Sequence, residues 1–266
     1  MRQPSTSPRT RRAVLSALGT GLVGLAGCAG GGTGTDDTER YPTVERSLGE
    51  SHDPRSGPTV TVRNPRLRTA VVIDQHTSPV GMTAGRQFVV VDVESADDAD
   101  PGSSSRFRAL TDGTPAEGGS ASLRSDVHPA ERGRPVGVPV AVDAVDSAGV
   151  AWVRGLPKSA VWALPEEVVG SLGTAARFEV EEASVSDETD PEVTLVVRNA
   201  GDRDGTFYAN VSGSQVQDGN AIVGVEVPAG ETVTHRERPG IRAPAGEETR
   251  VVVAWGTDRV AVVVRP

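Results

Sequence analysis

The chain has 266 residues, of which 36 are acidic, 27 are basic and one is a cysteine. This length suits one large domain or two ordinary ones. A single cysteine forms no internal disulfide and no cysteine-rich metal site, which excludes disulfide-stapled miniproteins, zinc fingers and iron–sulfur proteins. Val occurs 41 times against 12 Leu. Because β-branched residues favour pleated sheet over helix, this composition predicts an all-β fold.

The first 28 residues have the anatomy of an export signal. Four arginines and no acidic residue accompany an apolar run over 13–26, which is too short to span a bilayer comfortably. Arg11 and Arg12 stand in the stretch TRRAVL, which resembles a twin-arginine signal, and LAGC, ending at Cys28, resembles the lipobox of lipoproteins. These resemblances imply a signal peptide over 1–27, a lipid on Cys28 and a membrane-anchored protein on the extracytoplasmic face. The alternative, a short apolar helix with a chance cysteine, leaves the position of the only cysteine unexplained.

Removal of residues 1–27 takes away four arginines and no acidic residue, which changes the net charge from −9 to −13. Such a balance argues against nucleic-acid binding, which depends on clustered basic residues. Lys158 is the only lysine. Acid-rich, lysine-poor lipoproteins with twin-arginine signals resemble those of halophilic archaea, whose self-repulsion is screened by molar salt. The acidity therefore indicates a solvated surface and requires no ligand.

Residues 28–57 are rich in Gly, Thr, Ser, Asp and Glu and lack a periodic apolar pattern, which predicts a flexible, lipid-anchored tether. Beyond the tether, short apolar runs predict strands at 59–62, 68–74, 86–94, 107–110, 136–143 and 149–154. The run over 86–94 is long enough for a central strand. Pro135 and Pro139 predict that the strand over 136–143 lies at a sheet edge. Residues 165–173 predict a helix of at most two turns, where we place a domain boundary.

The first set of strands carries a family resemblance. The strand at 59–62, GRQFVVVDV over 85–93, FRALTDG over 107–113 and AVWALP over 160–165 resemble the telokin-like immunoglobulin domains of uncharacterised function in prokaryotic lipoproteins. The resemblance implies an immunoglobulin-like domain over 58–173. Domains of this family have no agreed catalytic residues to carry over.

Seven evenly spaced strands are predicted beyond the boundary, at 177–185, 192–198, 206–212, 221–227, 231–237, 248–255 and 259–265. Seven short strands in this length predict a sandwich. VVRNAGDRDGTF over 196–207 and VPAGET over 227–232 resemble the cell-adhesion-related, immunoglobulin-like domain of bacterial and archaeal surface proteins. Asn and Gly in these stretches tolerate positive φ, so we expect them to set hairpin turns, with 202–205 at a hairpin tip. The overall expectation is all-β, with two immunoglobulin-like β-sandwich domains over 58–173 and 174–266.

No catalytic pattern stands out in the sequence. There is no Gly-x-Ser-x-Gly elbow and no zinc-hydrolase spacing. With Cys28 lipidated, a blue-copper site lacks its cysteine. We therefore expect neither enzymatic activity nor a cofactor. The four histidines are isolated from one another, and the three tryptophans lie in apolar runs that favour a core role over a sugar platform (His52, His76, His128, His235; Trp152, Trp162, Trp255).

Two acidic stretches and one sequon leave alternatives open. One acidic stretch lies in a loop predicted over 97–105, and the other in a turn before the strand at 192–198 (Asp97, Asp98, Asp100; Asp187, Glu188, Asp190, Glu192). Both favour solvated turns, with calcium ligation as the alternative, because neither has the spacing of a dedicated calcium loop. Asn210-Val211-Ser212 is a glycosylation sequon or an ordinary piece of strand.

The expected function is that of a non-catalytic binding or accessory module of the cell envelope. Such a module holds an envelope protein or a surface glycan through its loops or an exposed sheet edge. Two alternatives remain, namely a structural spacer without a specific ligand and a sensor of a small solute or ion. Solute receptors are typically larger proteins with an α/β fold, so the sequence favours a binding or accessory module over a sensor.

Overall fold

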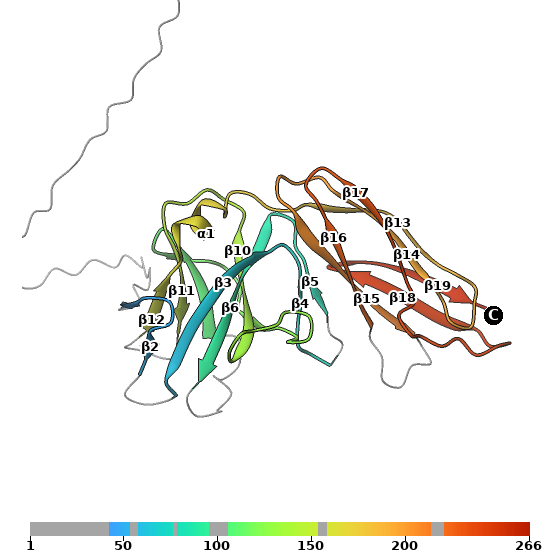
Figure 1. Cartoon of the computed structure of the whole chain (residues 1–266), viewed down its shortest axis with the longest axis horizontal. Coiled ribbons are helices and arrows are strands. Elements are labelled where there is room, and N and C mark those ends of the chain that lie inside the picture. Colours follow the sequence, from blue (N-terminus) through green and yellow to red (C-terminus); the bar gives the residue numbers. More distant parts are fainter. Residues whose placement is uncertain (1–42, 54–57, 77–78, 96–105, 154–158, 214–220) are drawn as a thin grey trace, which may run out of the picture. The chain divides into compact units, whose positions relative to one another are not determined.

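The computed structural model describes residues 43–53, 58–76, 79–95, 106–153, 159–213 and 221–266 (Figure 1). Over these residues the protein is predominantly β, as the composition predicts, with several antiparallel sheets. All of the described residues belong to one compact unit, and this unit contains two large hydrophobic cores. The predicted export and lipidation residues Arg11, Arg12 and Cys28 lie outside the described residues.

Two five-stranded sheets enclose the first core (Figure 1). Buried side chains of both sheets meet there, such as Val62 and Val91 from one and Val150 and Trp162 from the other. The first sheet has the order β2 (Ser51–His52), β3 (Val60–Arg68), β6 (Arg86–Ser95), β10 (Arg134–Ala141), β9 (Ala121–Ser122). The second has the order β1 (Thr43–Arg46), β12 (Ser159–Ala163), β11 (Ala148–Trp152), β7 (Phe107–Thr111), β8 (Thr114–Pro115).

Strand β6 is central, as its long apolar run predicts, and pairs with β3 and β10. Val91 faces the first core, while its neighbour Val90 packs on the other side of the sheet against Val71 and Leu123. Burial on both sides explains why β6 reads as a continuous run of valines instead of an alternating one. Val71 belongs to a small separate pair, β4 (Val71–Val72) with β5 (Val80–Gly81).

The tether prediction is wrong over residues 43–53, because β1 and β2 lie in this part of the stretch predicted to be flexible. β1 pairs in parallel with β12. Leu48 packs against the first core, and the Trp162 Nε1–H donates to the Glu50 carbonyl over 2.9 Å, although the two residues are 112 positions apart. Strand β1 is therefore stabilised by partners that are distant in the sequence, and its four residues show no local apolar pattern from which the strand could be predicted.

The edge prediction for β10 is also wrong. β10 pairs along its length with β6, and Val136 and Gly137 pair on the other side with the two residues of β9. Neither Pro135 nor Pro139 is in register with β9, so neither has to donate a backbone N–H there. Because β9 is only two residues long and does not pair with either proline, β10 can contain two prolines and still lie inside the sheet.

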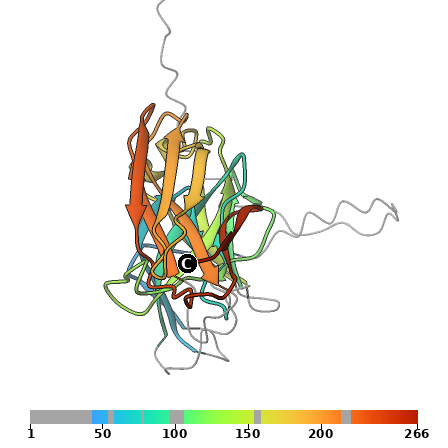
Figure 2. The ribbon, with the colours of Figure 1, turned by 90° about the vertical axis from the view of Figure 1, so that its right-hand side faces the viewer.

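All seven strands predicted after the boundary are present and enclose the second core (Figures 1 and 2). In β14, Val193, Leu195 and Val197 are buried and alternate with more exposed residues, as predicted. One sheet has the order β13 (Phe178–Val185), β14 (Val193–Asn199), β17 (Thr232–Glu237). The other has the order β16 (Ala221–Val227), β15 (Gly205–Gly213), β18 (Thr249–Trp255), β19 (Asp258–Val264). The predicted short helix is α1 (Glu166–Gly170).

Candidate functional site

The loop over 200–204 is held by one buried amide, that of Asn199. Its Oδ1 accepts the backbone N–H groups of Arg177 and Gly201 at 3.0 Å each. Its Nδ2 donates to the carbonyls of Arg203 at 2.8 Å and Val227 at 3.0 Å. Because both ends of the amide are bonded to backbone, the side chain fixes where the loop begins and ends.

Two expectations about this loop are wrong. The loop is not a hairpin, because β14 and β15 belong to different sheets and the chain crosses between them. Gly201 is not among the glycines with positive φ. A Cβ at Gly201 would lie 2.2 Å from the Ala175 carbonyl oxygen, so glycine is needed there for close backbone approach. The expectation holds for Gly230, whose φ is +75°.

Arg203 is the side chain that this loop positions. Its Nη2 donates to Gln87 Oε1 over 2.8 Å, and its Nη1 to the Ser171 carbonyl over 3.4 Å. Gln87 is fully buried in β6, and its Nε2 donates to the Leu172 carbonyl at 2.7 Å, which turns its oxygen toward Arg203. Burial of the guanidinium, and secondly the charge of Arg68, lower the pKa of Arg203. The guanidinium is therefore half-buried, fixed and close to a like charge.

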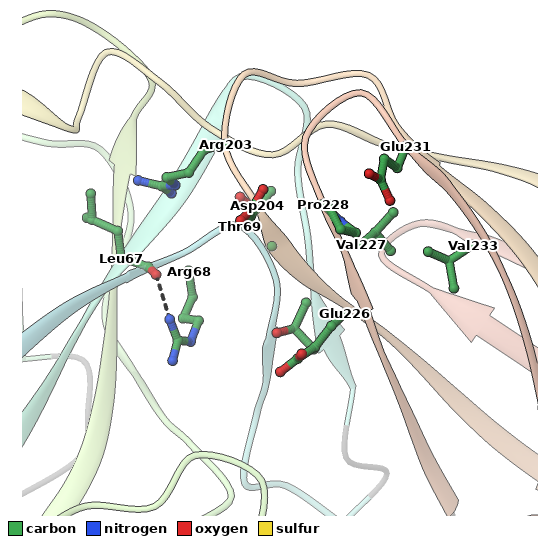
Figure 3. A pocket seen from close by; sticks show the side chains of 12 residues that line it. Leu67, Arg68, Thr69, Arg203, Asp204, Glu226, Val227, Pro228, Glu231 and Val233 are labelled. Carbon is green, nitrogen blue, oxygen red and sulfur yellow. Dashed lines mark hydrogen bonds between the residues drawn. The ribbon is translucent and has the colours of Figure 1, made fainter.

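Arg203 and Arg68 line a groove of about 610 Å³ (Figure 3). The lining comes from the end of β3, from the 203–206 segment entering β15, and from the β16–β17 region (Leu67, Arg68, Thr69, Arg203, Asp204, Gly205, Thr206, Glu226, Val227, Pro228, Glu231, Val233). Five of these side chains are ionisable. The Arg68 Nη1 donates to the Leu67 carbonyl over 3.1 Å, drawn dashed in Figure 3.

The charged side chains of the groove do not neutralise one another directly. Among the described residues, no carboxylate oxygen lies within 4.0 Å of the Arg68 or Arg203 guanidinium. In contrast, the neighbouring Arg66 pairs with the buried Asp92 over 2.6 Å. The groove thus holds two cations without an anionic partner in the described part of the chain.

A buried aromatic pair lies close to the groove. The rings of His128 and Tyr208 meet edge to face with centroids 5.3 Å apart. Burial raises the pKa of Tyr208, and the nearby charge of Arg68 opposes this shift. His128 Nε2 accepts the backbone N–H of Val72 at 2.9 Å. Burial, reinforced by Arg68 and Arg66, lowers the pKa of His128 to about 4, so the imidazole is neutral at pH 7.

The remaining histidines do not converge. His52 packs edge to face on Trp152, with centroids 5.9 Å apart, His76 is exposed, and His235 Nε2 lies 3.1 Å from a Glu237 carboxylate oxygen. Within the described residues, no group of three His, Cys, Asp or Glu side chains is arranged to hold a metal ion. The candidate calcium ligands Asp97, Asp98 and Asp100 lie outside the described residues.

The second acidic stretch surrounds an arginine. Arg238 Nη2 lies 3.2 Å from a Glu188 carboxylate oxygen, and other nitrogens of the same guanidinium lie 3.9 Å from Asp190 and from Glu192. Asp187 accepts the backbone N–H of Arg265. The Arg238 guanidinium therefore occupies the position that the calcium alternative would give to the metal ion, beside three of its four candidate ligands.

The tryptophan prediction is confirmed, because Trp152 and Trp162 are fully buried in the first core and Trp255 packs against the second core. Asn210, the sequon residue, is half-buried in β15, where it is paired with Ile222 on β16 and Ala254 on β18. Its glycosylation stays a prediction.

Sequence reasoning missed the groove, because Arg68 and Arg203 are 135 positions apart and neither belongs to a recognisable motif. The NAGDRDG stretch is the available signal, but its Asn and Gly residues predict only turns. No family model, curated protein or solved structure matches the chain. Among the described residues, no helix is long and apolar enough to cross a membrane.

Proposed function

We propose that this chain is a lipid-anchored protein of the extracytoplasmic membrane face, acting as a non-catalytic binding or accessory module of the cell envelope. One observation carries the proposal. Arg11 and Arg12, an apolar run, and the only cysteine, Cys28, directly after Leu-Ala-Gly, occur in this order ahead of the described β structure, whose first strand is β1. The order matches export, cleavage and lipidation followed by a displayed domain.

The proposed architecture is two immunoglobulin-like sandwiches, a telokin-like one predicted over 58–173, to which β1 and β2 add strands from the N-terminal side, and an adhesion-type one over 174–266. The strand order β3-β6-β10-β9 facing β1-β12-β11-β7-β8 supports the first, because it matches a four-stranded ABED sheet against a CFG sheet with additional edge strands. The seven strands β13 to β19, divided into sheets of three and four, support the second.

An exposed strand edge supports a binding role. Among the described strands, β19 pairs only with β18. Its residue Val263 has 50% of its surface exposed. Exposed sheet edges accept an extended segment of a partner through main-chain hydrogen bonds, with side-chain contacts adding specificity. An envelope protein is the partner class that this edge fits.

The anchoring part of the proposal is tested with Cys28→Ser in the full chain, carrying a C-terminal tag. We expect the variant to be released from membranes or to accumulate unprocessed, since the serine hydroxyl does not take the lipid of a lipobox cysteine. Fractionation and immunoblotting measure both outcomes. The double variant Arg11→Lys with Arg12→Lys tests export separately from lipidation. We expect it to retain the precursor inside the cell. A processed Cys28→Ser protein that stays on the membrane contradicts the proposal.

The accessory role is tested by crosslinking in intact membranes and capture through the C-terminal tag. One dominant protein, lost in Val263→Lys but retained in Val252→Thr, at a half-buried position on the neighbouring strand β18, supports the role. Recovery of the chain alone contradicts it and favours the spacer. This test does not depend on the outcome of the Cys28→Ser experiment, because it compares two variants that both keep the anchor.

A further inference from the structure

We infer that the groove lined by Arg68 and Arg203 binds a small zwitterionic solute, one that carries both a carboxylate and a positively charged nitrogen. The inference goes beyond the proposed function. It requires neither the lipid on Cys28 nor a protein partner, and it rests on the positions of five charged side chains around one groove.

The cationic side of the groove is ready to accept a carboxylate. Arg203 is held by Gln87 Oε1 at 2.8 Å and by the Ser171 carbonyl at 3.4 Å. These two bonds use two of the five N–H donors of a guanidinium, and the Arg68 bond to Leu67 uses one. A carboxylate accepts paired N–H groups from arginine in charge-assisted bonds, which are stronger than neutral ones. A bound carboxylate would also relieve the repulsion between the two arginines.

The other side of the groove is anionic. Figure 3 shows Glu226 and Glu231 across the groove from Arg68 and Arg203. In the same view Asp204 lies between Arg203 and Pro228, and its Oδ1 accepts the Ala229 N–H at 2.8 Å. Among the described residues, no basic side-chain nitrogen lies within 4.0 Å of any of these three carboxylates. A positively charged nitrogen finds acceptors there without displacing an existing ion pair.

The balance of charge decides the class of ligand. Two arginines and three carboxylates line the groove, so a simple anion meets an excess of negative charge and a simple cation meets two guanidinium groups. A molecule with both charges pairs with each side at once. A volume of about 610 Å³ lies within the ordinary range of small-molecule sites and admits a molecule of amino-acid size.

The experiment measures binding of ω-amino carboxylates to the purified full chain by isothermal titration calorimetry. Glycine, β-alanine, γ-aminobutyrate and ε-aminocaproate separate the two charges by increasing lengths. Butyrate and butylammonium each carry one of the two charges. We expect one member of the series to bind at least tenfold more tightly than either singly charged compound, because it makes both contacts.

Two variants locate the binding. Arg68→Gln and Glu226→Gln remove one charge from each side, and both residues are exposed, so the fold is retained. Each should weaken the preferred zwitterion about tenfold, whereas Arg242→Gln, at an exposed position that does not line the groove, should leave binding unchanged. Absence of binding by every zwitterion, or equal binding by wild type and both groove variants, overturns the inference. Either negative result leaves the anchoring and partner tests unaffected.

Discussion

His128 is a neutral, buried imidazole whose protonation opposes the fold. Its Nε2 accepts the Val72 N–H, so a proton on that nitrogen removes the acceptor. Its ring lies against Tyr208. Arg66 and Arg68 add positive charge nearby, which lowers the pKa further, while Asp126 opposes them. The pKa of about 4 therefore lies below the ordinary value of 6.5.

We predict that the free energy of unfolding falls as pH drops from 6.5 to about 4. In this window the unfolded chain binds a proton on His128 and the folded protein does not, so acid favours unfolding. The contribution is fully present above pH 6.5 and amounts to about 3 kcal/mol at most. Urea unfolding at a series of pH values measures it.

Carboxylates also titrate near the lower end of this window, so the His128 contribution needs a comparison between variants. His128→Gln removes the titrating group and should flatten the slope between pH 6.5 and 5. His76→Gln, at an exposed position, should leave the slope as in wild type. Equal slopes in all three proteins would show that His128 does not cause the dependence.

At the scale of loops and strands, Gly201 and Gly230 are required for different physical reasons. A Cβ at Gly201 meets backbone, the Ala175 oxygen at 2.2 Å and the Arg177 nitrogen at 2.6 Å. Gly230 has open space around it but a φ of +75°. At Gly201 an added Cβ would clash with backbone that the Asn199 side chain holds in place. At Gly230 an alanine would be strained by its left-handed backbone conformation but would meet no clash.

We therefore predict that Gly201→Ala lowers the free energy of unfolding by about 3 kcal/mol, and Gly230→Ala by about 1 kcal/mol. Urea denaturation of the two variants beside wild type measures both values. Gly113, which also has positive φ and open space, is a matched second site, and Gly113→Ala should resemble Gly230→Ala. A larger loss in Gly230→Ala than in Gly201→Ala would refute the close-approach explanation.

Strands with a local apolar pattern could be predicted from the sequence. The groove could not be predicted, because its residues come together only in the folded chain. All seven strands β13 to β19 follow from alternation and turn residues, and β6 follows from its valines. β1 was missed because its partner β12 is far away in the sequence and its own apolar content is one valine. Arg68 and Arg203 were missed for the same reason, since only the folded chain brings them to one groove. The sequence predicted a turn set by positive φ at Asn199, but Asn199 does not have a positive φ, and its side chain instead makes four hydrogen bonds to the backbone.

At the scale of the whole molecule, the excess of acidic residues opposes compactness. The full chain carries a net charge of −9. Several surface ion pairs, such as Arg63 with Glu94 at 3.0 Å, are partly exposed and contribute little. The Arg66–Asp92 pair is different, because the Asp92 carboxylate is fully buried and also accepts bonds from Asn64 Nδ2 and the Glu131 N–H at 3.0 Å each. Salt therefore screens mainly the general repulsion and leaves this buried pair in place.

We predict that the melting temperature rises as KCl increases from about 0.1 M to about 1 M, because the screening length falls from about 10 Å to about 3 Å. Scanning calorimetry measures the rise. Glu181→Gln with Glu182→Gln removes two exposed charges of β13, so this variant should melt higher than wild type in low salt and respond less to KCl. Glu45→Asp on β1 keeps the charge and should respond as wild type does. A melting temperature that stays level or falls with KCl would mean that local ion pairs, and not the net acidity, dominate the electrostatics of this fold.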